Sequence, residues 1–408
     1  MSEKSQVEKK QKKSRGHFSL RLAYGSDIVI HMAMLFLMAF GLIMIGSASM
    51  GLAVGNNRYL AVTEIKQIVF LLAGYFMMAK LSNAFSLHFL HSSKFPSIII
   101  LMEIALLVCL AFPSAGGAKG WIRIPLPGME VTLQPSEFAK IVSILIVAGY
   151  TGEVKKRFKS RTAFLLKPVL FIGIYIFTIF VLQSDLGSAA VITLISVACF
   201  MIPNHPQMRL FQHVLQALFV TGVIAAVYLL SPAGASFIES LPIATYQKNR
   251  FLSAINPFMD QYGSGYQLVN GLVSFASGGW FGVGFGNSVR KYTDFPAANT
   301  DFILAIVVEE LGFVGFLLLM TAYAVIIFRL LFFAMKIKNE QARIILVGTA
   351  MYFLVHIIFN VGGVTGFIPL TGVPLLMISS GGSSTLSIMM CVGIAQGVIA
   401  AYNRGEIR

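Results

Sequence analysis

Charged residues are scarce in this sequence. Only 12% of its 408 residues are Asp, Glu, Lys or Arg, whereas soluble domains carry roughly 25%. Hydrophobic residues make up 56% of the chain, and its mean hydropathy is +0.78. The shortage of charge excludes a soluble enzyme, a disordered protein and a nucleic-acid-binding domain. A polytopic membrane protein is the class that fits.

Cysteine is also scarce, and its placement excludes two kinds of site. The chain has three cysteines, and Cys109, Cys199 and Cys391 all lie inside apolar runs without a CxxC pair. Neither a disulfide framework nor a zinc site is therefore expected. Small apolar packing residues are the simpler interpretation.

Long apolar runs, in contrast, are plentiful. A run of about 20 apolar residues is long enough to cross a bilayer as a helix. Ten such runs can be counted, at about 28–50, 66–82, 97–113, 134–152, 163–183, 186–203, 208–230, 301–333, 343–362 and 373–401. They predict an all-α polytopic membrane protein with about ten transmembrane helices.

Lysine and arginine are unevenly divided between the two sides that these runs define. With the N-terminus inside, 22 of them fall on the inner side and 8 on the outer side, and such an excess is typical of cytoplasmic segments. Both termini are therefore expected in the cytoplasm, as a basic tail at 1–26 and a short tail at 403–408 around a transmembrane domain at 27–402. The net charge of +14 then fits contact with anionic membrane lipid, and no nucleic-acid partner is needed.

One connection between the runs is long. Residues 231–300 fall on the outer side between the seventh and eighth runs, and they include the stretch LVNGLVSFASGGWFGVGFG. A segment so rich in glycine and aromatic residues is expected to fold onto the outer surface of the membrane. Loops of this length in compact proteins are usually functional.

Acidic residues at membrane depth are the first candidates for function. A charge at the centre of a membrane helix costs roughly 2.5–3.5 kcal/mol, so each one needs a partner or a wet cavity. Glu137 and Lys140 are three residues apart and share a helix face. They form either an ion pair that fixes the helix or the wall of a cavity that binds a charged substrate.

Four further acids stand at the start of apolar runs or within them. Asp185, in QSDLG, either caps the following helix or lines a site, and the same two interpretations apply to Asp301, which opens TDFILAIVVEELG. Glu309 and Glu310 are adjacent, so one helix face cannot bury both. One of them is expected to meet a partner or a neutralising proton.

A break in the apolar pattern lies between the ninth and tenth runs. Residues 360–384 read NVGGVTGFIPLTGVPLLMISSGGSS, and such irregular backbone is tolerated at membrane depth only against protein or a wet cavity. The segment is either a tight helical hairpin or a site whose hydroxyls and amides hold a phosphate or sugar. Together with 134–140, 183–187 and 299–310 it falls at the outer face, which predicts a polar cavity opening outward.

These segments carry motifs that resemble a known family. The chain resembles the SEDS family (shape, elongation, division and sporulation), the polytopic glycosyltransferases of the bacterial cell wall typified by FtsW and RodA, over roughly 27–402. The motifs, in family order, are GAKGWI at 117–122 with QPSEFAK at 134–140, QSDLGS at 183–188, NRFLSAINPFMDQYGSGYQ at 249–267, SGGWFGVGFG at 277–286, NTDFILAIVVEELGFVG at 299–315, and NVGGVTGFIPLTGVP with SSGGSS at 360–384. His356 stands where the family usually has Gln.

The resemblance implies an activity and the residues that perform it. Members are inverting glycosyltransferases that polymerise lipid II, an undecaprenyl-pyrophosphate-linked disaccharide-pentapeptide, at the outer face of the cytoplasmic membrane. The essential acid of the family's TDF motif corresponds to Asp301, and its other motif residues correspond to Glu137, Lys140 and Asp185. A carboxylate within reach of an acceptor hydroxyl can take its proton as it attacks, so Asp301 is expected to be the general base.

The leaving pyrophosphate needs cations. The basic candidates on the outer side are Arg123, Lys140, Arg250, Arg290 and Lys291, and the other residues expected in the cavity are Gln267, Thr300, Ser383 and Ser384. Arg290 and Lys291 are alternatively a solvated loop pair. A divalent cation, Mg²⁺ or Mn²⁺, held by Asp301 or pyrophosphate oxygens fits this chemistry, whereas no dedicated metal cage and no organic cofactor are expected.

The resemblance also implies partners, and two alternative roles stay open. Expected partners are a class B penicillin-binding transpeptidase and other divisome or elongasome proteins. The basic N-terminal tail and the wording AANTDFILAIVVEELG favour a division-type member that acts in septal synthesis, with an elongation-type member as the alternative. A lipid II flippase would also use polar residues around a membrane cavity, although the outer-face clustering of the acids and the lack of visible inverted repeats count against it.

Overall fold

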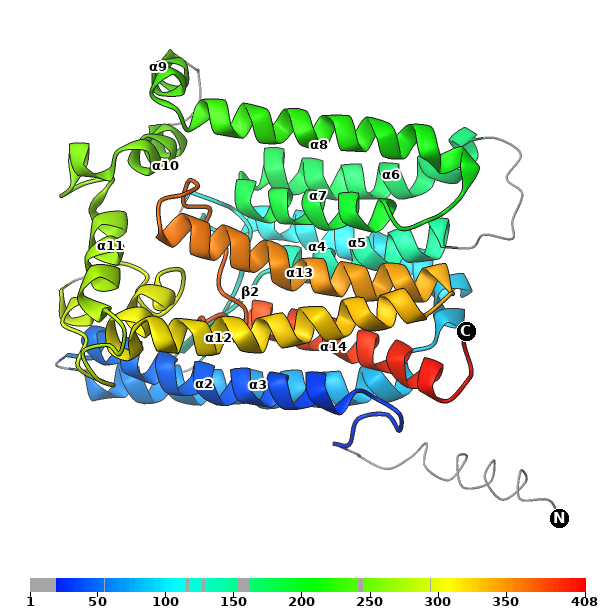
Figure 1. Cartoon of the computed structure of the whole chain (residues 1–408), viewed down its shortest axis with the longest axis horizontal. Helices are drawn as coiled ribbons and strands as arrows, with labels where there is room; N and C mark the ends of the chain where they lie inside the picture. The colour runs from blue at the N-terminus through cyan, green and yellow to red at the C-terminus, as the bar shows by residue number, and fades with distance from the viewer. Residues whose placement is uncertain are drawn as a thin grey trace.

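The computed structural model describes residues 20–54, 56–114, 117–126, 129–152, 161–240, 245–293 and 295–408. The first 19 residues of the basic tail expected at 1–26 lie outside these ranges. Within them, ten helices of 15 to 34 residues run side by side (Figure 1): α2 Ile28–Leu52, α3 Asn57–Ala84, α4 Lys94–Val108, α5 Pro135–Thr151, α6 Arg161–Phe177, α7 Leu186–Phe200, α8 Arg209–Leu229, α12 Ile303–Lys336, α13 Glu340–Val364 and α14 Gly382–Asn403. The all-α membrane fold predicted from the apolar runs is confirmed.

Each predicted run overlaps one of these helices, but not all of the run boundaries are right. The second run, predicted at 66–82, is wrong at its start because α3 begins at Asn57. Eight helices in the described part of the chain are long and apolar enough to cross a membrane, α4 and α6 only together with the helical turns that follow them. Helices α5 and α7 do not reach that length, so the count of ten spans stays a prediction. The tenth run, predicted at 373–401, is wrong at its start because α14 begins only at Gly382. Residues 366–381 cannot continue a helix, since Gly366 and Gly372 have φ of 76° and 71° and prolines interrupt the segment.

Short polar side chains begin several helices. Asp27 accepts a hydrogen bond from the backbone N–H of Ile30 at 2.8 Å, which caps α2. The same carboxylate pairs with Arg329 of α12, and the side chain of Gln396 in α14 accepts a hydrogen bond from the Asp27 N–H at 2.7 Å. One cap therefore ties α2, α12 and α14 together at the end of the bundle where the chain starts and finishes.

Three short α-helices lie at the opposite end (Figure 1). The segment predicted to be a folded outer loop, 231–300, contains three short helices among its described residues, α9 Pro232–Ser240, α10 Thr245–Ile255 and α11 Tyr266–Gly278. A two-stranded antiparallel hairpin, β1 Ile122–Leu126 and β2 Met129–Leu133, pairs Arg123 with Thr132 just before α5. The short helices and the loops between them cover this end, and the hairpin contacts α14.

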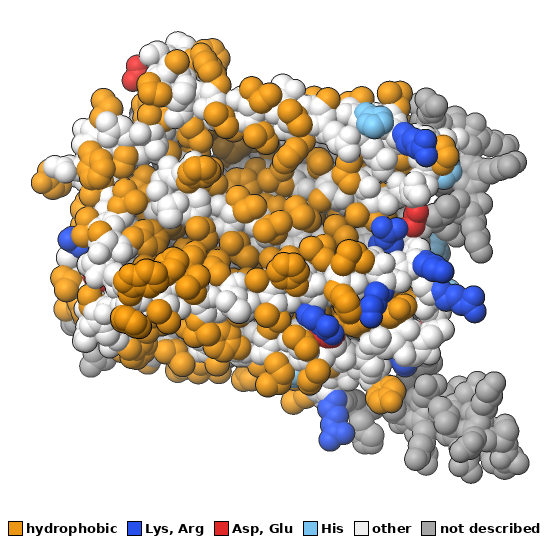
Figure 2. Space-filling view, viewed as in Figure 1, with side chains coloured by type: hydrophobic (Ala, Val, Ile, Leu, Met, Phe, Trp, Pro, Cys, Tyr) orange, Lys and Arg blue, Asp and Glu red, His pale blue; other side chains and the backbone are white. Residues whose placement is uncertain are grey.

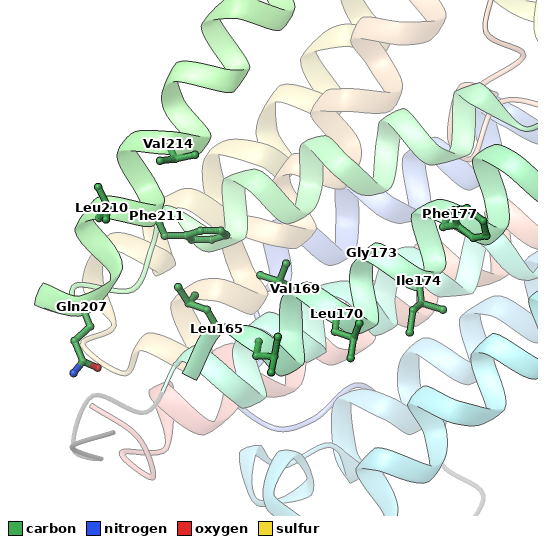
Figure 3. Close-up of a pocket in the computed structure, with 11 residues that line it drawn as sticks. Leu165, Val169, Leu170, Gly173, Ile174, Phe177, Gln207, Leu210, Phe211 and Val214 are labelled. Atoms are coloured by element: carbon green, nitrogen blue, oxygen red, sulfur yellow. The ribbon is translucent and has the colours of Figure 1, made fainter. Parts of the chain in front are cut away.

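The surface of the bundle has the character of a multi-pass membrane protein. Figure 2 shows a broad face of hydrophobic side chains, with most of the visible Lys and Arg gathered near the end where α14 finishes. Helix α8 has no buried residue. An apolar groove of about 710 Å³ separates α8 from α6 (Figure 3), lined by side chains such as Val169, Phe211 and Val214. Such a surface suits acyl chains.

Helix α12 is broken near its start. Gly312 has φ 68° and ψ −168°, which are not helical values. The part from Phe313 to Lys336 is roughly 35 Å long at about 1.5 Å per residue, which is enough to span a hydrocarbon core of about 30 Å. Residues 303–310 are buried and are not needed to cross the membrane. They pack in the core instead, directly after the turn that contains Asp301 and the buried Phe302.

Replacing Gly312 with Ala is expected to destabilise the protein by about 1–3 kcal/mol, because an L side chain is strained at this φ. The added Cβ would also lie 2.4 Å from the Gly282 N and the Trp280 O. Gly222 of α8 is the matched control: its Cβ meets nothing within 4 Å, and Ala is favoured there by about 0.5–1 kcal/mol. The midpoint of thermal unfolding in detergent measures both. An equal change of the unfolding midpoint in both variants would contradict a special requirement for glycine at position 312.

Candidate active site

Asp301 lies at the turn before α12, and its backbone is fixed from several sides. The Asn360 side chain donates to the Asp301 O at 2.9 Å, the Ser379 hydroxyl donates to the Thr300 O at 2.9 Å, and the Ser380 N–H donates to the Asn299 O at 2.9 Å. Phe302, not Asp301, is the N-cap of α12, and it makes no side-chain cap bond. The capping interpretation of Asp301 is therefore wrong, and its carboxylate is left for another role.

The Asp301 carboxylate and the Arg250 guanidinium border the same small residue. A Cβ placed on Gly372 would lie 3.7 Å from Asp301 Oδ2 and 3.8 Å from Arg250 Nη1. The guanidinium is held by a 2.9 Å hydrogen bond from Nη1 to the Leu370 O. Burial raises the pKa of Asp301, and the positive charge of Arg250 opposes that rise. A raised pKa makes this carboxylate a stronger base than an ordinary Asp.

Two polar cavities open beside Asp301. The smaller, about 260 Å³, is lined by Arg250, Gln267 and Leu370 among others. The larger, about 530 Å³, reaches the residues directly before Asp301 and is lined by Asn56, Arg58, Tyr59, Val62, Thr63, Lys66, Glu130, Asn299, Thr300 and Ser380. Asp301 itself lines neither cavity: its cationic neighbour Arg250 lines the smaller one, and the larger one contains two further cations, Arg58 and Lys66.

Arg58 and Lys66 are site candidates that the sequence analysis missed. They were counted as outer basic residues, but not as members of the cavity. The signal that could have found them is their spacing: Arg58, Val62 and Lys66 follow one another at intervals of four, so they share one face of α3. That face lines the larger cavity.

Glu137 and Lys140 form a buried ion pair. Lys140 Nζ lies 2.7 Å from Glu137 Oε1, and both side chains are almost fully buried. The Tyr352 hydroxyl donates to Glu137 Oε2 at 2.9 Å. His356 Nε2 lies 2.9 Å from Lys140 Nζ, and His356 Nδ1 lies 3.0 Å from the Pro374 O. The helix-fixing interpretation fits this geometry, and substrate contact stays a prediction.

Asp185 and Ser383, at the start of α14, are joined through Gln134, the residue before α5. Asp185 caps α7 by accepting a 2.9 Å hydrogen bond from the Ser188 N–H, so the capping interpretation is confirmed. Its other oxygen accepts from the Gln134 side chain at 3.1 Å, and the Gln134 N–H donates to the Ser383 hydroxyl at 2.9 Å. Ser384 donates instead to the Gly381 O at 3.1 Å.

The remaining basic candidates differ in their surroundings. Arg123 lies 3.6 Å from Glu130 of its own hairpin, on a partly exposed surface. Arg290 Nη1 donates to the Asn270 side chain at 3.3 Å. Lys291 is buried, with its Nζ 2.8 Å from Glu310 Oε1, so the interpretation as a solvated loop pair is wrong for Lys291.

The acids Glu309 and Glu310 are both buried, and each lies on its own face of the helix with its own partners, so the expectation that one of them meets a partner is confirmed. The segment 286–291 wraps over this end of α12 and supplies each with its own donors. Glu309 accepts from the Ser288 hydroxyl at 2.7 Å and from the Val289 N–H at 3.1 Å. Glu310 accepts from the Ser47 hydroxyl and from Lys291, so the broken helix offers two faces to two sets of partners.

The four segments predicted to meet do lie together, joined by the loop that precedes α14. That loop contacts the turn before α12 through Ser379 and α13 through Pro374 and His356, and Ser383, at the start of α14, contacts Gln134 just before α5. The two polar cavities near Asp301 are lined by residues of the outer loops and α3, and not by Asp301, Glu137 or Asp185. A single cavity shared by all these acids therefore stays a prediction.

No group of three or more His, Cys, Asp or Glu side chains in the described ranges could hold a metal ion. Asp301 is one carboxylate beside a guanidinium, and that donor set does not form a cage. A divalent cation at Asp301 would need most of its ligands from substrate oxygens and water.

Comparisons with known proteins agree with this architecture. The sequence model of the FtsW/RodA/SpoVE family, described as cell cycle protein, matches residues 27–404. The chain is 31% identical to the probable peptidoglycan glycosyltransferase FtsW of Coxiella burnetii, over 91% of this chain and 96% of that protein. It is 31% identical to the stage V sporulation protein E of Bacillus subtilis, over 93% and 98% of the two chains.

The fold is similar to that of solved structures. A chain from the structure of a peptidoglycan synthase complex that coordinates polymerization and crosslinking superimposes with a TM-score of 0.70 at 23% identity, over 93% of this chain and 98% of that one. The rod shape determining protein RodA of Thermus thermophilus gives a TM-score of 0.61 at 20% identity, over 92% and 97%. The extent of the sequence match places this chain in the FtsW/RodA/SpoVE family of polytopic membrane proteins.

Proposed function

We propose that this protein is an inverting peptidoglycan glycosyltransferase that polymerises lipid II at the outer face of the cytoplasmic membrane. The observation that carries the proposal is the placement of Asp301, a half-buried carboxylate beside Arg250, near two cavities that its neighbours line: Arg250 lines the smaller one, and Asn299 and Thr300 line the larger one. A polymerase must hold a donor and an acceptor at once, and two cavities near one base meet that need. The names of the similar FtsW proteins support the same activity.

The reaction follows from these groups. The Asp301 carboxylate takes the proton of the acceptor sugar hydroxyl while its oxygen attacks the anomeric carbon of the donor. The bond from that carbon to the pyrophosphate oxygen breaks, and its electron pair leaves with the pyrophosphate. Attack from the side opposite the leaving group inverts the anomeric centre. Arg250 lies where it can stabilise the charge that develops on the leaving group. A divalent cation bound to the pyrophosphate would share that task.

Replacing Arg250 with Ala is expected to lower the polymerisation rate and to move its acid limb to higher pH. The base works only when ionised, so activity is lost as pH falls through the pKa of Asp301. Burial already raises that pKa and Arg250 opposes the rise, so removing the cation raises it further. The pH profile of the rate on purified lipid II measures the shift. An unchanged profile would contradict the assignment of Asp301 and Arg250 as neighbours in the reaction.

The proposal also covers the orientation of the chain in the membrane and its role in the cell. The Lys and Arg side chains near the end where α14 finishes (Figure 2) support cytoplasmic termini and an outward site. We propose a role in septal synthesis with a class B penicillin-binding transpeptidase, in line with the synthase complex whose chain has this fold. Depletion tests the role: filaments or chains without septa would support division, and round cells would support elongation.

The activity itself is tested with purified protein and lipid II. Glycan strands separated by gel electrophoresis would support the proposal. In reconstituted vesicles, movement of labelled lipid II between leaflets without any glycan product would contradict it and would favour a flippase.

A further inference from the structure

Part of the large outer loop exposes aromatic side chains although it belongs to no membrane span. We name residues 279–286, GWFGVGFG, the aromatic loop. Trp280 is 66% exposed and Phe281 is 82% exposed, and Phe285 is also exposed. The loop carries no charged residue. Three large exposed aromatic side chains in eight uncharged residues are an apolar patch that needs a partner.

The aromatic loop is continuous with a surface that already faces lipid. The ring of Trp280 packs edge-on against Phe313 of α12, with ring centroids 5.3 Å apart. Phe313 begins the spanning part of α12, and the exposed Val314 and Leu317 follow it on the helix. The apolar patch of the loop therefore extends the membrane face of α12 beyond its kink.

The depth of this junction follows from the length of α12. Lys336, exposed at the far end of the helix, marks one membrane boundary. From Lys336 to Phe313 the helix rises roughly 35 Å, so Phe313 and Trp280 lie close to the opposite boundary of a hydrocarbon core of about 30 Å. Trp is enriched at this boundary because its ring is apolar while its N–H stays near water.

Backbone polar groups of the aromatic loop are hydrogen-bonded to α12, as a low-dielectric environment requires. The N–H groups of Val283 and Gly284 donate to the Glu309 and Glu310 carbonyls at 2.9 and 3.1 Å. In return, the carbonyls of Gly279 and Trp280 accept from the Phe313 and Val314 N–H groups at 2.9 and 3.0 Å. The broken helix and the loop thus satisfy each other's backbone groups, which irregular backbone at membrane depth requires.

We propose that the aromatic loop is an interfacial anchor that inserts Trp280 and Phe281 into the lipid leaflet at this end of the bundle. The partner is the lipid surface itself, at the level where headgroups meet acyl chains. The loop leads into the buried cluster of Lys291, Glu310 and Ser47, and that cluster fixes the segment that continues to Asp301. The anchor therefore sets the depth of Asp301 relative to lipid headgroups, and this last step rests on the proposed function.

The sequence offers a direct test because it contains only two tryptophans, Trp121 and Trp280. In the variant Trp121→Phe, Trp280 is the sole indole. The variant is reconstituted in vesicles of phosphatidylcholine brominated either near the glycerol or near the methyl end of the acyl chain. Trp280 fluorescence is expected to be lost mainly with the bromines near the glycerol, with little loss to iodide in the water. This readout needs no enzymatic activity, so it is independent of the proposed function.

The matched control is Trp280→Phe, in which Trp121 on the loop leading to β1 reports alone. Trp121 is expected to show weaker quenching by either brominated lipid than Trp280 shows. If Trp121→Phe fails to fold, the difference between the unmodified protein and Trp280→Phe isolates the Trp280 signal. Strong quenching of Trp280 by aqueous iodide with none by brominated lipid would overturn the anchor and would instead indicate a surface open to water or a protein. Strongest quenching by the deepest bromines would overturn the proposed depth.

Discussion

Replacing Asp301 with Asn is expected to lower the rate of glycan polymerisation by about 10²–10⁴-fold, the usual contribution of a general base. Asn keeps the size of the side chain but cannot take the proton of the acceptor hydroxyl. The backbone of residue 301 is fixed through Asn360 and the neighbouring residues through Ser379 and Ser380, so the variant should fold normally. Gel analysis of glycan products from purified lipid II measures the rate, and the midpoint of thermal unfolding checks the fold.

Asp260 provides the matched control for this substitution. It lies in the same outer loop, and its carboxylate accepts a hydrogen bond from the Ser264 N–H at 2.6 Å. Asp260→Asn keeps an acceptor oxygen in that position and should leave the polymerisation rate unchanged. Polymerisation at the normal rate by Asp301→Asn, or an equal loss in both variants, would rule out Asp301 as the base.

The fold was largely predictable from the sequence because the signals are local. A run of about 20 apolar residues specifies a membrane helix whatever its neighbours are, and the helices of the bundle lie where these runs lie. The start of α14 was misplaced by counting apolar residues alone. The glycines and prolines of 360–384 indicated irregular backbone, and the positive φ at Gly366, Gly372 and Met377 shows that the loop extends to the start of the helix.

The sequence predicted which residues belong to the candidate site better than it predicted which side chains they pair with. The separate motifs pointed to Asp301, Glu137 and Asp185, and a single loop joins the segments that carry them. Which acid pairs with which donor depends on contacts between residues far apart in the chain. The pairing of Ser47 with Glu310, 263 residues apart, has no signal in local spacing.

Replacing Lys140 with Met is expected to destabilise the protein by about 3–5 kcal/mol, because it leaves the buried carboxylate of Glu137 without its cation. The Lys140 and Glu137 side chains are 1% and 2% exposed, so water cannot take the place of the missing partner. The double variant Glu137→Gln with Lys140→Met removes both charges and should recover most of the loss, since apolar or neutral replacements of a whole buried pair are often close to neutral. Lys94→Met, at an exposed lysine, is the control and should stay within about 0.5 kcal/mol of the unmodified protein. Thermal unfolding in detergent measures all four proteins. A double variant as unstable as Lys140→Met alone would mean that the loss comes from packing around the lysine stem and not from an uncompensated charge.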